Sequence, residues 1–367
     1  MKIGVLTSSR ADSGIYTPLL KALKNDPFFE LEIIAFGTHL SEKFGYTVKT
    51  IEADGYFVPH KIDTMPEGDK PEHITCSMGK TMINFAKLWS SNQFDIVFAL
   101  GDRFEMFAAV ASSTPFNIKI AHLHGGETTL GAIDNAFRHS ITHMSSIHFA
   151  STEEYAKRVI ELIGHNENVY NVGALGFDNL SSLQLLSIED FKEKYTVDLT
   201  IPTILITFHP ETISYENNEK YALELVESLS EIKGYQFLFT MPNADTMGNI
   251  IREKLNVFIK NNNNAFGFEN LGTLGYLSAM KHCSFMMGNT SSGCIEASYF
   301  PQWVINLGDR QKGRIVTPNM INCIVEKTAI LKTVQNIRTK NIPEKISIYG
   351  DGNSATKIIK TLKQIHG

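Results

Sequence analysis

The chain has 367 residues, of which 43% are hydrophobic and 20% charged, and its formal net charge is −5 at pH 7. This length and composition are typical of a globular protein with two domains of ordinary size, each able to bury its own core. The negative charge and the scatter of basic residues give no reason to expect nucleic acid or a membrane surface as a partner.

The start of the sequence, MKIGVLTSSRADSG, has one lysine and then a short strand pattern, not the apolar region of a signal peptide, and no later stretch approaches a membrane span. The four cysteines lie far apart without CxxC spacing, so neither a zinc site nor a disulfide framework is indicated. We therefore expect a cytoplasmic protein with reduced cysteines that act as small apolar fillers.

Short apolar runs alternate with helical patterns along most of the chain, which predicts an α/β fold with parallel sheets. In the first half we expect strands at 2–7, 31–36, 57–62, 95–102, 118–126, 146–151 and 169–174. The helices expected between them cover 14–24, 41–53, 72–90, 106–113, 134–145 and 153–163. The pattern becomes irregular from 173 to 187, so we place the first domain at 1–178.

The second half repeats the scheme and predicts a domain at 179–350. Its expected strands are 203–210, 235–243, 265–270, 284–289 and 303–308, and its expected helices are 219–232, 247–260, 273–282 and 291–299. The last amphipathic segment, 354–364, predicts a helix in residues 351–367 that packs back on the first domain. The predicted architecture is two Rossmann-like domains that face a cleft.

Chemically active side chains gather between Gly101 and His139. Two neighbouring strand ends and the next helix start carry Asp102, Arg103, His122, His124, Glu127, Asp134, Arg138 and His139. The carboxyl ends of parallel strands are where open α/β sheets bind ligands. Any one of these residues could be structural, for example Asp102 as a helix cap, but the group favours acid–base chemistry on an anionic substrate.

Three further stretches follow predicted strands. SSRADSGIYTPL and GNTSSGCIEA each place hydroxyl and backbone N–H groups at a helix start, which suits a phosphate or a carboxylate. In TFHPET, His209 stands at a strand end, and GDRQKGR supplies Arg310 and Arg314. The chain has neither GxGxxG nor GxxxxGK[ST], so these stretches favour a substrate linked to a nucleotide diphosphate over a dinucleotide or P-loop site.

An ordered set of motifs resembles the hydrolysing UDP-N-acetylglucosamine 2-epimerases of sialic-acid and related nonulosonate biosynthesis. The motifs are SRADSGIY, GTHLSEKFG, GDRFE, HLHGGETT…GAIDNAFRH, FHPET, MPNADTMG, FENLG, GNTSSG and INLGDRQKGR. The resemblance runs from about Arg10 to Arg314, and the ordered set is far more specific than any single motif.

The resemblance implies a glycosyltransferase-B-like fold, a UDP-sugar substrate, UDP as a product, and no cofactor or metal for the chemistry. It implies elimination of UDP to a 2-acetamidoglycal, then addition of water with inversion at C2 to give N-acetylmannosamine or a related sugar. It also implies a homo-oligomer, a dimer or a tetramer.

The resemblance implies roles for the residues of this chain that stand at matching positions of the motifs. The catalytic residues that the resemblance implies are Asp102, His124, Glu127, Asp134 and His209. The substrate- and UDP-binding residues that it implies are Arg10, Ala11, Ser13, His39, Arg103, Asn243, Phe268, Thr290, Ser291, Glu296 and Arg310.

One position departs from the family pattern. Where several members read HxEGGE, this chain has His124, so either His124 or Glu127 takes the role of that glutamate. An enzyme acting on UDP-2,4-diacetamido-2,4,6-trideoxyglucose, in the legionaminic-acid branch, would have similar motifs. A non-hydrolysing 2-epimerase, a glycosyltransferase and a nucleotide-sugar-binding regulator without activity are less favoured alternatives.

Overall fold

The computed structural model describes residues 1–242, 245, 248–341, 343, 344, 346 and 348–366. The chain divides into two compact units, each of which is described by itself. The first unit comprises Met1–Glu127, Asp134–Ser182 and Ile348–Gly367, and the second comprises Thr128–Ile133 and Leu183–Ser347. A six-residue segment within the first half of the sequence therefore belongs to the second unit.

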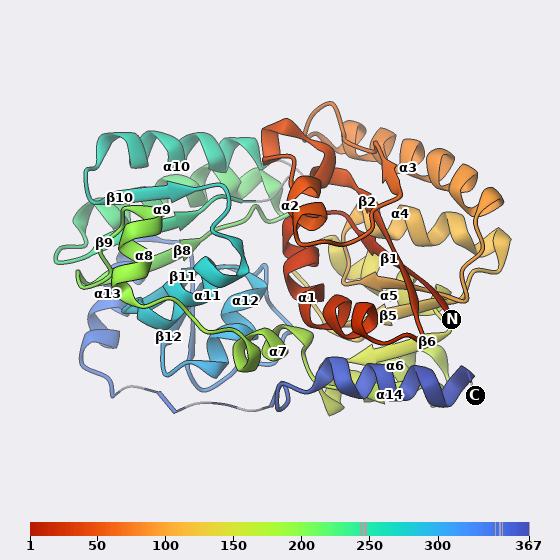
Figure 1. The fold of residues 1–367 in the computed structure, drawn as a ribbon. Helices are drawn as coiled ribbons and strands as arrows, with labels where there is room; N and C mark the ends of the chain where they lie inside the picture. Colours follow the sequence, from red (N-terminus) through yellow and green to blue (C-terminus); the bar gives the residue numbers. More distant parts are fainter. Residues whose placement is uncertain (243–244, 246–247, 342, 345, 347, 367) are drawn as a thin grey trace. The chain divides into compact units, whose positions relative to one another are not determined.

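The first unit is built on a seven-stranded parallel sheet (Figure 1). Its strands are β1 (Lys2–Thr7), β2 (Glu30–Phe36), β3 (His60–Ile62), β4 (Ile96–Leu100), β5 (Ile120–Leu123), β6 (Ile147–Ala150) and β7 (Val169–Asn171). Their order is β3-β2-β1-β4-β5-β6-β7, so the direction of winding reverses between β1 and β4. That reversal is where ligands bind in this class of sheet.

Helices connect the strands of the first unit. They are α1 (Arg10–Asn25), α2 (Val48–Ala53), α3 (Pro71–Ser91), α4 (Phe104–Ser113), α5 (Asp134–Met144), α6 (Glu153–Ile163), α7 (Leu175–Ser182) and α14 (Ser354–His366). Short 3-10 segments are η1 (Gly37–Leu40), η2 (Glu42–Phe44) and η3 (Thr114–Phe116). Every residue of β4 is buried, as expected for a strand covered on both faces.

The second unit repeats the plan on a six-stranded parallel sheet of order β10-β9-β8-β11-β12-β13. Its strands are β8 (Thr203–Thr207), β9 (Gln236–Thr240), β10 (Ala265–Phe268), β11 (Phe285–Gly288), β12 (Trp303–Leu307) and β13 (Met320–Cys323). Its helices are α8 (Ile188–Tyr195), α9 (Asn218–Glu231), α10 (Asn249–Asn261), α11 (Gly272–His282), α12 (Ser291–Cys294) and α13 (Lys327–Arg338), with η4 (Tyr215–Asn217) and η5 (Glu296–Tyr299). Here the reversal lies between β8 and β11.

Three predicted helices differ from the structure. Helix α1 begins at Arg10 and not at Gly14, because Ser9 is its N-cap and forms a capping box with Asp12. The helix expected at 41–53 is interrupted by left-handed backbone at Gly45 and Tyr46, so it is divided into the 3-10 segment η2 and the short helix α2. The helix expected at 291–299 is divided into α12 and η5.

The last helix completes the core of the first unit. The fully buried side chains of Ile358 and Leu362 on α14 join the hydrophobic cluster that includes Leu19 and Leu23 of α1. The start of α14 is capped from α7, since the carboxylate of Asp178 accepts the N–H groups of Ser354 (2.9 Å) and Ala355 (2.7 Å).

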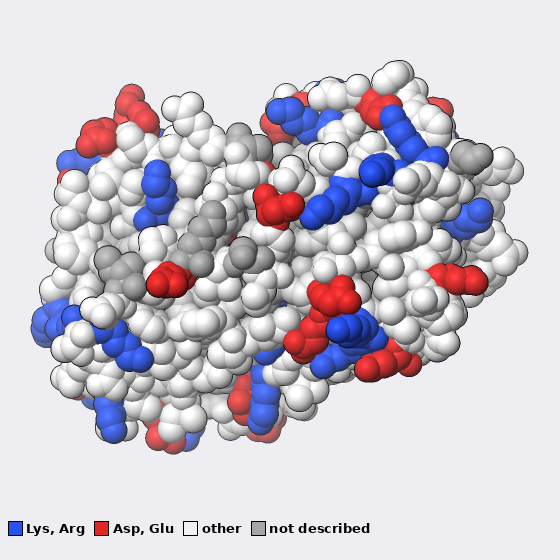
Figure 2. Space-filling model, turned by 90° about the horizontal axis from the view of Figure 1, so that it is seen from below, with Lys and Arg blue, Asp and Glu red and all other residues white. Residues whose placement is uncertain are grey.

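No described helix is both long enough and apolar enough to cross a membrane. Figure 2 shows one face of the molecule, on which lysine and arginine side chains lie among aspartate and glutamate side chains. This interspersed pattern agrees with the scatter of charge along the sequence.

Candidate active site

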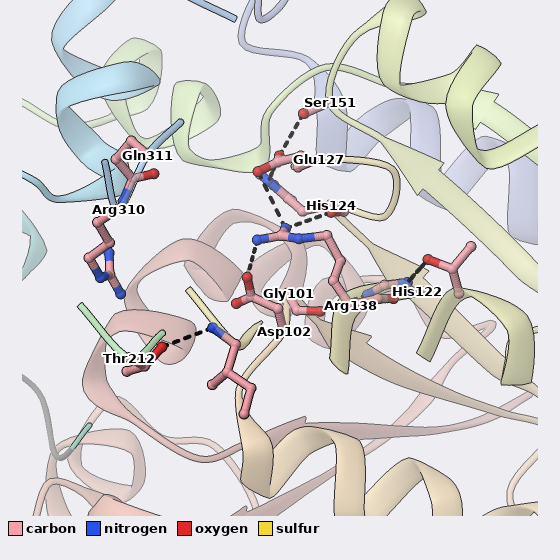
Figure 3. A network of polar contacts seen from close by, with 12 residues as sticks. Gly101, Asp102, His122, His124, Glu127, Arg138, Ser151, Thr212, Arg310 and Gln311 are labelled. Atoms are coloured by element: carbon pink, nitrogen blue, oxygen red, sulfur yellow. Dashed lines mark hydrogen bonds and ion pairs between the residues drawn. The ribbon is translucent and has the colours of Figure 1, made fainter. Parts of the chain in front are cut away.

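A buried arginine connects the ends of β4 and β5 in the first unit (Figure 3). Arg138 of α5 is 2% exposed, and its Nη2 forms an ion pair with the carboxylate of Asp102, which follows β4. Its Nη1 donates to the carbonyl oxygen of His124 (3.0 Å) and to Oε2 of Glu127 (3.4 Å), both of which follow β5. One guanidinium group thus fixes two carboxylates and the turn that carries an imidazole.

The turn from His124 to Glu127 folds back on itself. His124 has φ 63°, a left-handed conformation that few residues other than glycine adopt. Gly126 has φ 78°, and a Cβ atom there would lie 2.3 Å from the carbonyl oxygen of Tyr155, so the position requires glycine. As a result Glu127 faces His124, with 2.8 Å between its Oε1 and Nδ1 of the imidazole.

Glu127 is 1% exposed and accepts a third hydrogen bond, from Oγ of Ser151 at the end of β6 (2.8 Å).

His122, the other imidazole of this region, supports the backbone. Its Nε2 contacts the carbonyl oxygen of Gly101 (2.8 Å) and its Nδ1 contacts Oγ1 of Thr142 (3.2 Å). Burial lowers the pKa of His122 to about 3, so this ring is neutral and fixes the residue that precedes Asp102.

Asp134 is the first residue of α5 and is half-buried, one helical turn before Arg138.

Arg103 follows Asp102, and its guanidinium forms two hydrogen bonds with the fully buried carboxylate of Glu105 (3.1 and 3.0 Å). Burial raises the pKa of Glu105, and the charge of Arg103 opposes that rise. Glu105 thus orients Arg103.

The turn after β1 places Arg10, Ala11 and Ser13 in the first turn of α1. Arg10 and Ser13 are half-buried and Ala11 is exposed. The turn is rigid because the carboxylate of Asp12 accepts the N–H groups of Ser8 (2.9 Å) and Ser9 (3.0 Å). This turn adjoins the point where the first sheet reverses its winding.

His39 is fully buried, and hydroxyl groups contact both of its ring nitrogens. Nε2 lies 2.9 Å from Oγ1 of Thr7, and Nδ1 lies 2.7 Å from Oγ1 of Thr47. Burial lowers the pKa of His39 to about 4, against the opposing effect of Asp12. These contacts favour a structural role for His39 over the expected contact with the sugar.

The second unit gathers its polar residues where β8 and β11 end. Asn289 follows β11, and its amide group holds the backbone of His209, accepting from its N–H (2.7 Å) and donating to its carbonyl (2.8 Å). The carbonyl oxygen of Asn289 accepts from Nη1 of Arg310 (3.2 Å) and from Nε2 of Gln311 (2.8 Å). Asp245 lies 3.8 Å from Nδ1 of His209 and 3.7 Å from Nη2 of Arg310.

Glu211 and Thr212 hold two loops of the second unit. The carboxylate of Glu211, 4% exposed as a residue, accepts the N–H of Asp309 (2.9 Å). The hydroxyl of Thr212 accepts the N–H of Ile133 (2.9 Å), which ends the segment Thr128–Ile133. Gly131 of that segment touches the Asp309 backbone, where a Cβ atom would lie 2.3 Å from the carbonyl oxygen.

The turn after β11 carries hydroxyl groups. Thr290 is the N-cap of α12, Ser291 is its first residue, and Glu296 begins η5. Oγ of Ser292 bridges Oγ1 of Thr290 (3.1 Å) and the phenol of Tyr276 (2.6 Å). Burial raises the pKa of Tyr276 to about 12, so the phenol stays protonated.

Phe268 and Asn243 are the two remaining residues that the sequence predicts for substrate binding. Phe268 lies in β10 and packs edge-on against Tyr195 at 5.7 Å between ring centroids. Asn243 lies outside the described residues. Within the part of the chain that the structure describes, no group of three or more His, Cys, Asp or Glu is arranged to hold a metal ion.

The two sheets place the chain in a known class of folds. UDP-N-acetylglucosamine 2-epimerases from Neisseria meningitidis, bound to UDP-GlcNAc, and from Methanocaldococcus jannaschii, bound to UDP-GlcNAc and UDP, each give a TM-score of 0.82. The comparisons cover 99% of this chain and 100% of each of those chains, at 16% and 20% identity. The fold is therefore two parallel-sheet α/β domains of the glycosyltransferase-B-like class.

The chain belongs to the UDP-N-acetylglucosamine 2-epimerase family, which it matches over residues 21–363. It is 37% identical over 337 residues to the polysialic acid biosynthesis protein P7 of Escherichia coli (91% of this chain, 85% of the relative). It is 38% identical over 322 residues to the GDP/UDP-N,N'-diacetylbacillosamine 2-epimerase (hydrolyzing) of Campylobacter jejuni (88% and 84%). The UDP-N,N'-diacetylbacillosamine 2-epimerase (hydrolyzing) of Legionella pneumophila is 30% identical over 364 residues (99% and 96%). The chain is thus an enzyme of the 2-epimerase kind.

Proposed function

We propose that this enzyme is a hydrolysing 2-epimerase that converts a UDP-linked 2-acetamido sugar and water into UDP and the free sugar inverted at C2. The observation that carries the proposal is the network that Arg138 forms with Asp102, Glu127 and the His124 turn. Removal of a proton from C2 needs a base, and this network supplies carboxylates and an imidazole at neighbouring strand ends.

Two chemical steps account for the products. Elimination breaks the bond between C1 and the UDP oxygen while C2 loses its proton, giving UDP and a 2-acetamidoglycal. Addition of water then places a hydroxyl on C1 and a proton on C2, from the face that inverts the configuration. We assign Asp102 and Asp134 to proton transfer in the addition of water, and His209 to the side of the leaving diphosphate.

The second unit supplies groups that suit UDP. Arg310 carries the positive charge that a departing diphosphate requires, and Asn289 fixes its guanidinium. Thr290 and Ser291 offer hydroxyls and backbone N–H groups to phosphate oxygens, and Glu296 offers an acceptor for the ribose hydroxyls. Arg10, Ser13 and Arg103 are the further positions that we propose for contact with the substrate.

Two sugars are candidate substrates. UDP-N-acetylglucosamine would give N-acetylmannosamine, for nonulosonate biosynthesis of the sialic-acid type. UDP-2,4-diacetamido-2,4,6-trideoxyglucose, which is UDP-N,N'-diacetylbacillosamine, is supported by the names of the Campylobacter and Legionella relatives. A cytoplasmic location and a homo-oligomeric state stay predictions.

Incubation of the purified chain with each UDP-sugar in a separate tube tests the proposal. Chromatography should show free UDP and the free manno-configured sugar in equal amounts, and the larger kcat/KM identifies the substrate. If both UDP-sugars stay intact, or if the epimer keeps its UDP, a hydrolysing epimerase is ruled out.

A further inference from the structure

Two buried polar atoms of the network, Nε of Arg138 and Nε2 of His124, have no partner among the described residues. Nε2 of His124 is buried and neither accepts nor donates a hydrogen bond within the described part of the chain. The residue as a whole is 7% exposed. The other ring nitrogen, Nδ1, contacts Glu127 at 2.8 Å. A buried nitrogen without a partner is costly, so its persistence at strand ends points to a ligand that completes it.

The surroundings of Glu127 determine which nitrogen of His124 carries the proton. Arg138, Ser151 and His124 all direct polar atoms at this carboxylate, an arrangement that suits its ionised form. An ionised carboxylate only accepts hydrogen bonds, so Nδ1 of His124 is the donor. The neutral ring therefore has its lone pair on Nε2, the free atom.

We infer that His124 is the base that removes the C2 proton of the UDP-sugar through Nε2, and that Glu127 is a positioning residue that acts through His124. This inference rests on the proposed function and assigns the two roles that the sequence leaves open. The left-handed backbone of His124 is held by its N–H bond to the carbonyl of Phe149 (3.0 Å) and by Arg138 on its own carbonyl. Strain of this kind persists where a side chain must be aimed.

The neighbouring carboxylates are less suited to this step. Both oxygens of Glu127 already accept hydrogen bonds, Oε1 from His124 and Ser151 and Oε2 from Arg138. The carboxylate of Asp102 is engaged in an ion pair with the guanidinium of Arg138. His124 has a free lone pair and a carboxylate behind the ring that stabilises the imidazolium formed by proton transfer.

The elimination of UDP involves three changes at C1 and C2. The Nε2 lone pair takes the hydrogen of C2, the C2–H electrons form the C1=C2 bond, and the C1–O bond breaks with its electron pair going to UDP. The imidazolium then returns its proton to water. A solvent-derived proton reaches C2 from the opposite face when water adds to the glycal, so the C2 hydrogen of the product comes from solvent.

The test separates the two halves of the reaction. His124→Asn is compared with the wild type and with His143→Asn, a control at an exposed histidine on α5. We expect His124→Asn to lower kcat for UDP release at least a hundredfold with KM changed less than threefold. Hydration of the 2-acetamidoglycal in the presence of UDP should stay within threefold of the wild-type rate.

Other outcomes overturn specific parts of the account. Unchanged UDP release by His124→Asn, or equal losses in release and hydration, contradicts the role of His124 as the eliminating base. His124→Gly, which suits the left-handed backbone, repeats the test in a variant expected to fold. If the wild-type enzyme leaves UDP-sugars intact, the proposed function and this inference are both overturned. If the wild-type enzyme cannot hydrate the glycal, the mechanism by elimination of UDP and addition of water is contradicted.

A double-mutant cycle tests the role of Glu127. Glu127→Gln keeps an oxygen for Nδ1 but removes the charge, so kcat should fall while UDP affinity measured by calorimetry is unchanged. Because Glu127 acts through His124, adding Glu127→Gln to His124→Asn should lower kcat by less than threefold more. If the two losses multiply, Glu127 acts independently and the assignment is wrong.

Discussion

Arg138 shows how a single residue organises the candidate site. Its guanidinium reaches Asp102 after β4 and both His124 and Glu127 after β5, so it sets the spacing of groups that are 36, 14 and 11 residues away in the sequence. Removing it would leave two carboxylates without their shared cation. The arginine is therefore as important to the geometry as the carboxylates themselves.

Asp102→Asn should lower kcat by roughly a hundredfold or more, because general acid–base groups typically contribute that much. UDP should still bind, since the change leaves the second unit intact. Asp63→Asn, at an exposed aspartate paired with Lys80, is the matched control. Steady-state kinetics and calorimetry measure both effects, and a fully active Asp102→Asn would remove this residue from the mechanism.

Arg310→Ala should weaken UDP binding by about 2 kcal/mol, roughly thirtyfold, because it removes a half-buried cation from the proposed diphosphate site. Arg338→Ala, at an exposed arginine of α13, should leave the affinity unchanged. Calorimetric titration with UDP measures the affinity of each variant. Equal affinities for the wild type and Arg310→Ala would place the diphosphate elsewhere.

Residue types at strand ends made part of the site predictable. Asp102, His124 and Glu127 follow apolar runs directly, and the structure joins them in one network. The sequence did not reveal that Ser151 and Asn289 take part, because a serine or asparagine after a strand is also common in ordinary turns. The partners of Arg138 lie on other elements of the fold, and a local sequence pattern does not predict contacts between elements.

At the scale of elements, a proline within α1 is accommodated by α7. Pro18 has no N–H group, so the carbonyl of Gly14 lacks its helical donor. The amide of Asn179 supplies a replacement at 2.8 Å, and Asn179 is 3% exposed. This bond connects α1 to the helix that also caps α14 through Asp178.

Asn179→Ala should destabilise the first unit by about 1–3 kcal/mol, because the half-buried carbonyl of Gly14 would be left without a donor. The exposed Asn166→Ala is the control and should change stability by less than about 0.5 kcal/mol. Urea unfolding followed by fluorescence measures both. Equal midpoints for the two variants would show that water replaces the amide without cost.

Element prediction succeeded where apolar runs are bounded clearly and failed elsewhere. The strands of both sheets up to β12 lie where the sequence predicts them. Strand β13 is only four residues long and is buried only at its two ends, so it lacks an apolar run. Helix α13 carries Ile330, Val334 and Ile337 at helical spacing, a signal present in the sequence beyond the last expected strand. Helix α7 lies in the stretch that we expected to be irregular, and α8 begins directly after it, where we predicted no element.

At the scale of the whole molecule, buried neutral histidines make stability depend on pH. Burial lowers the pKa of His122 to about 3 and the pKa values of His39 and His148 to about 4, well below the ordinary value of 6.5. Between pH 6.5 and 4 the unfolded chain therefore binds protons that the folded chain does not. The free energy of unfolding should fall as the pH drops through this range, by up to about 1.4 kcal/mol per pH unit for each histidine.

His148→Leu isolates one of these groups, because His148 lies outside the proposed site and its Nδ1 has no partner among the described residues. The stability difference between wild type and variant should shift in favour of the variant by about 1 kcal/mol as the pH falls from 6 to 5. Trp89 reports on the first unit in a Trp303→Phe background. Parallel stability curves would mean that His148 titrates normally.

The central claim is that UDP leaves by elimination and that water then adds to the glycal. Proton NMR of the reaction in D2O, followed from the first turnovers, tests it most directly. The account predicts free UDP in equal amount with a manno-configured sugar that carries deuterium at C2 in every product molecule. A product that keeps its C2 proton, or an epimer still linked to UDP, would contradict it.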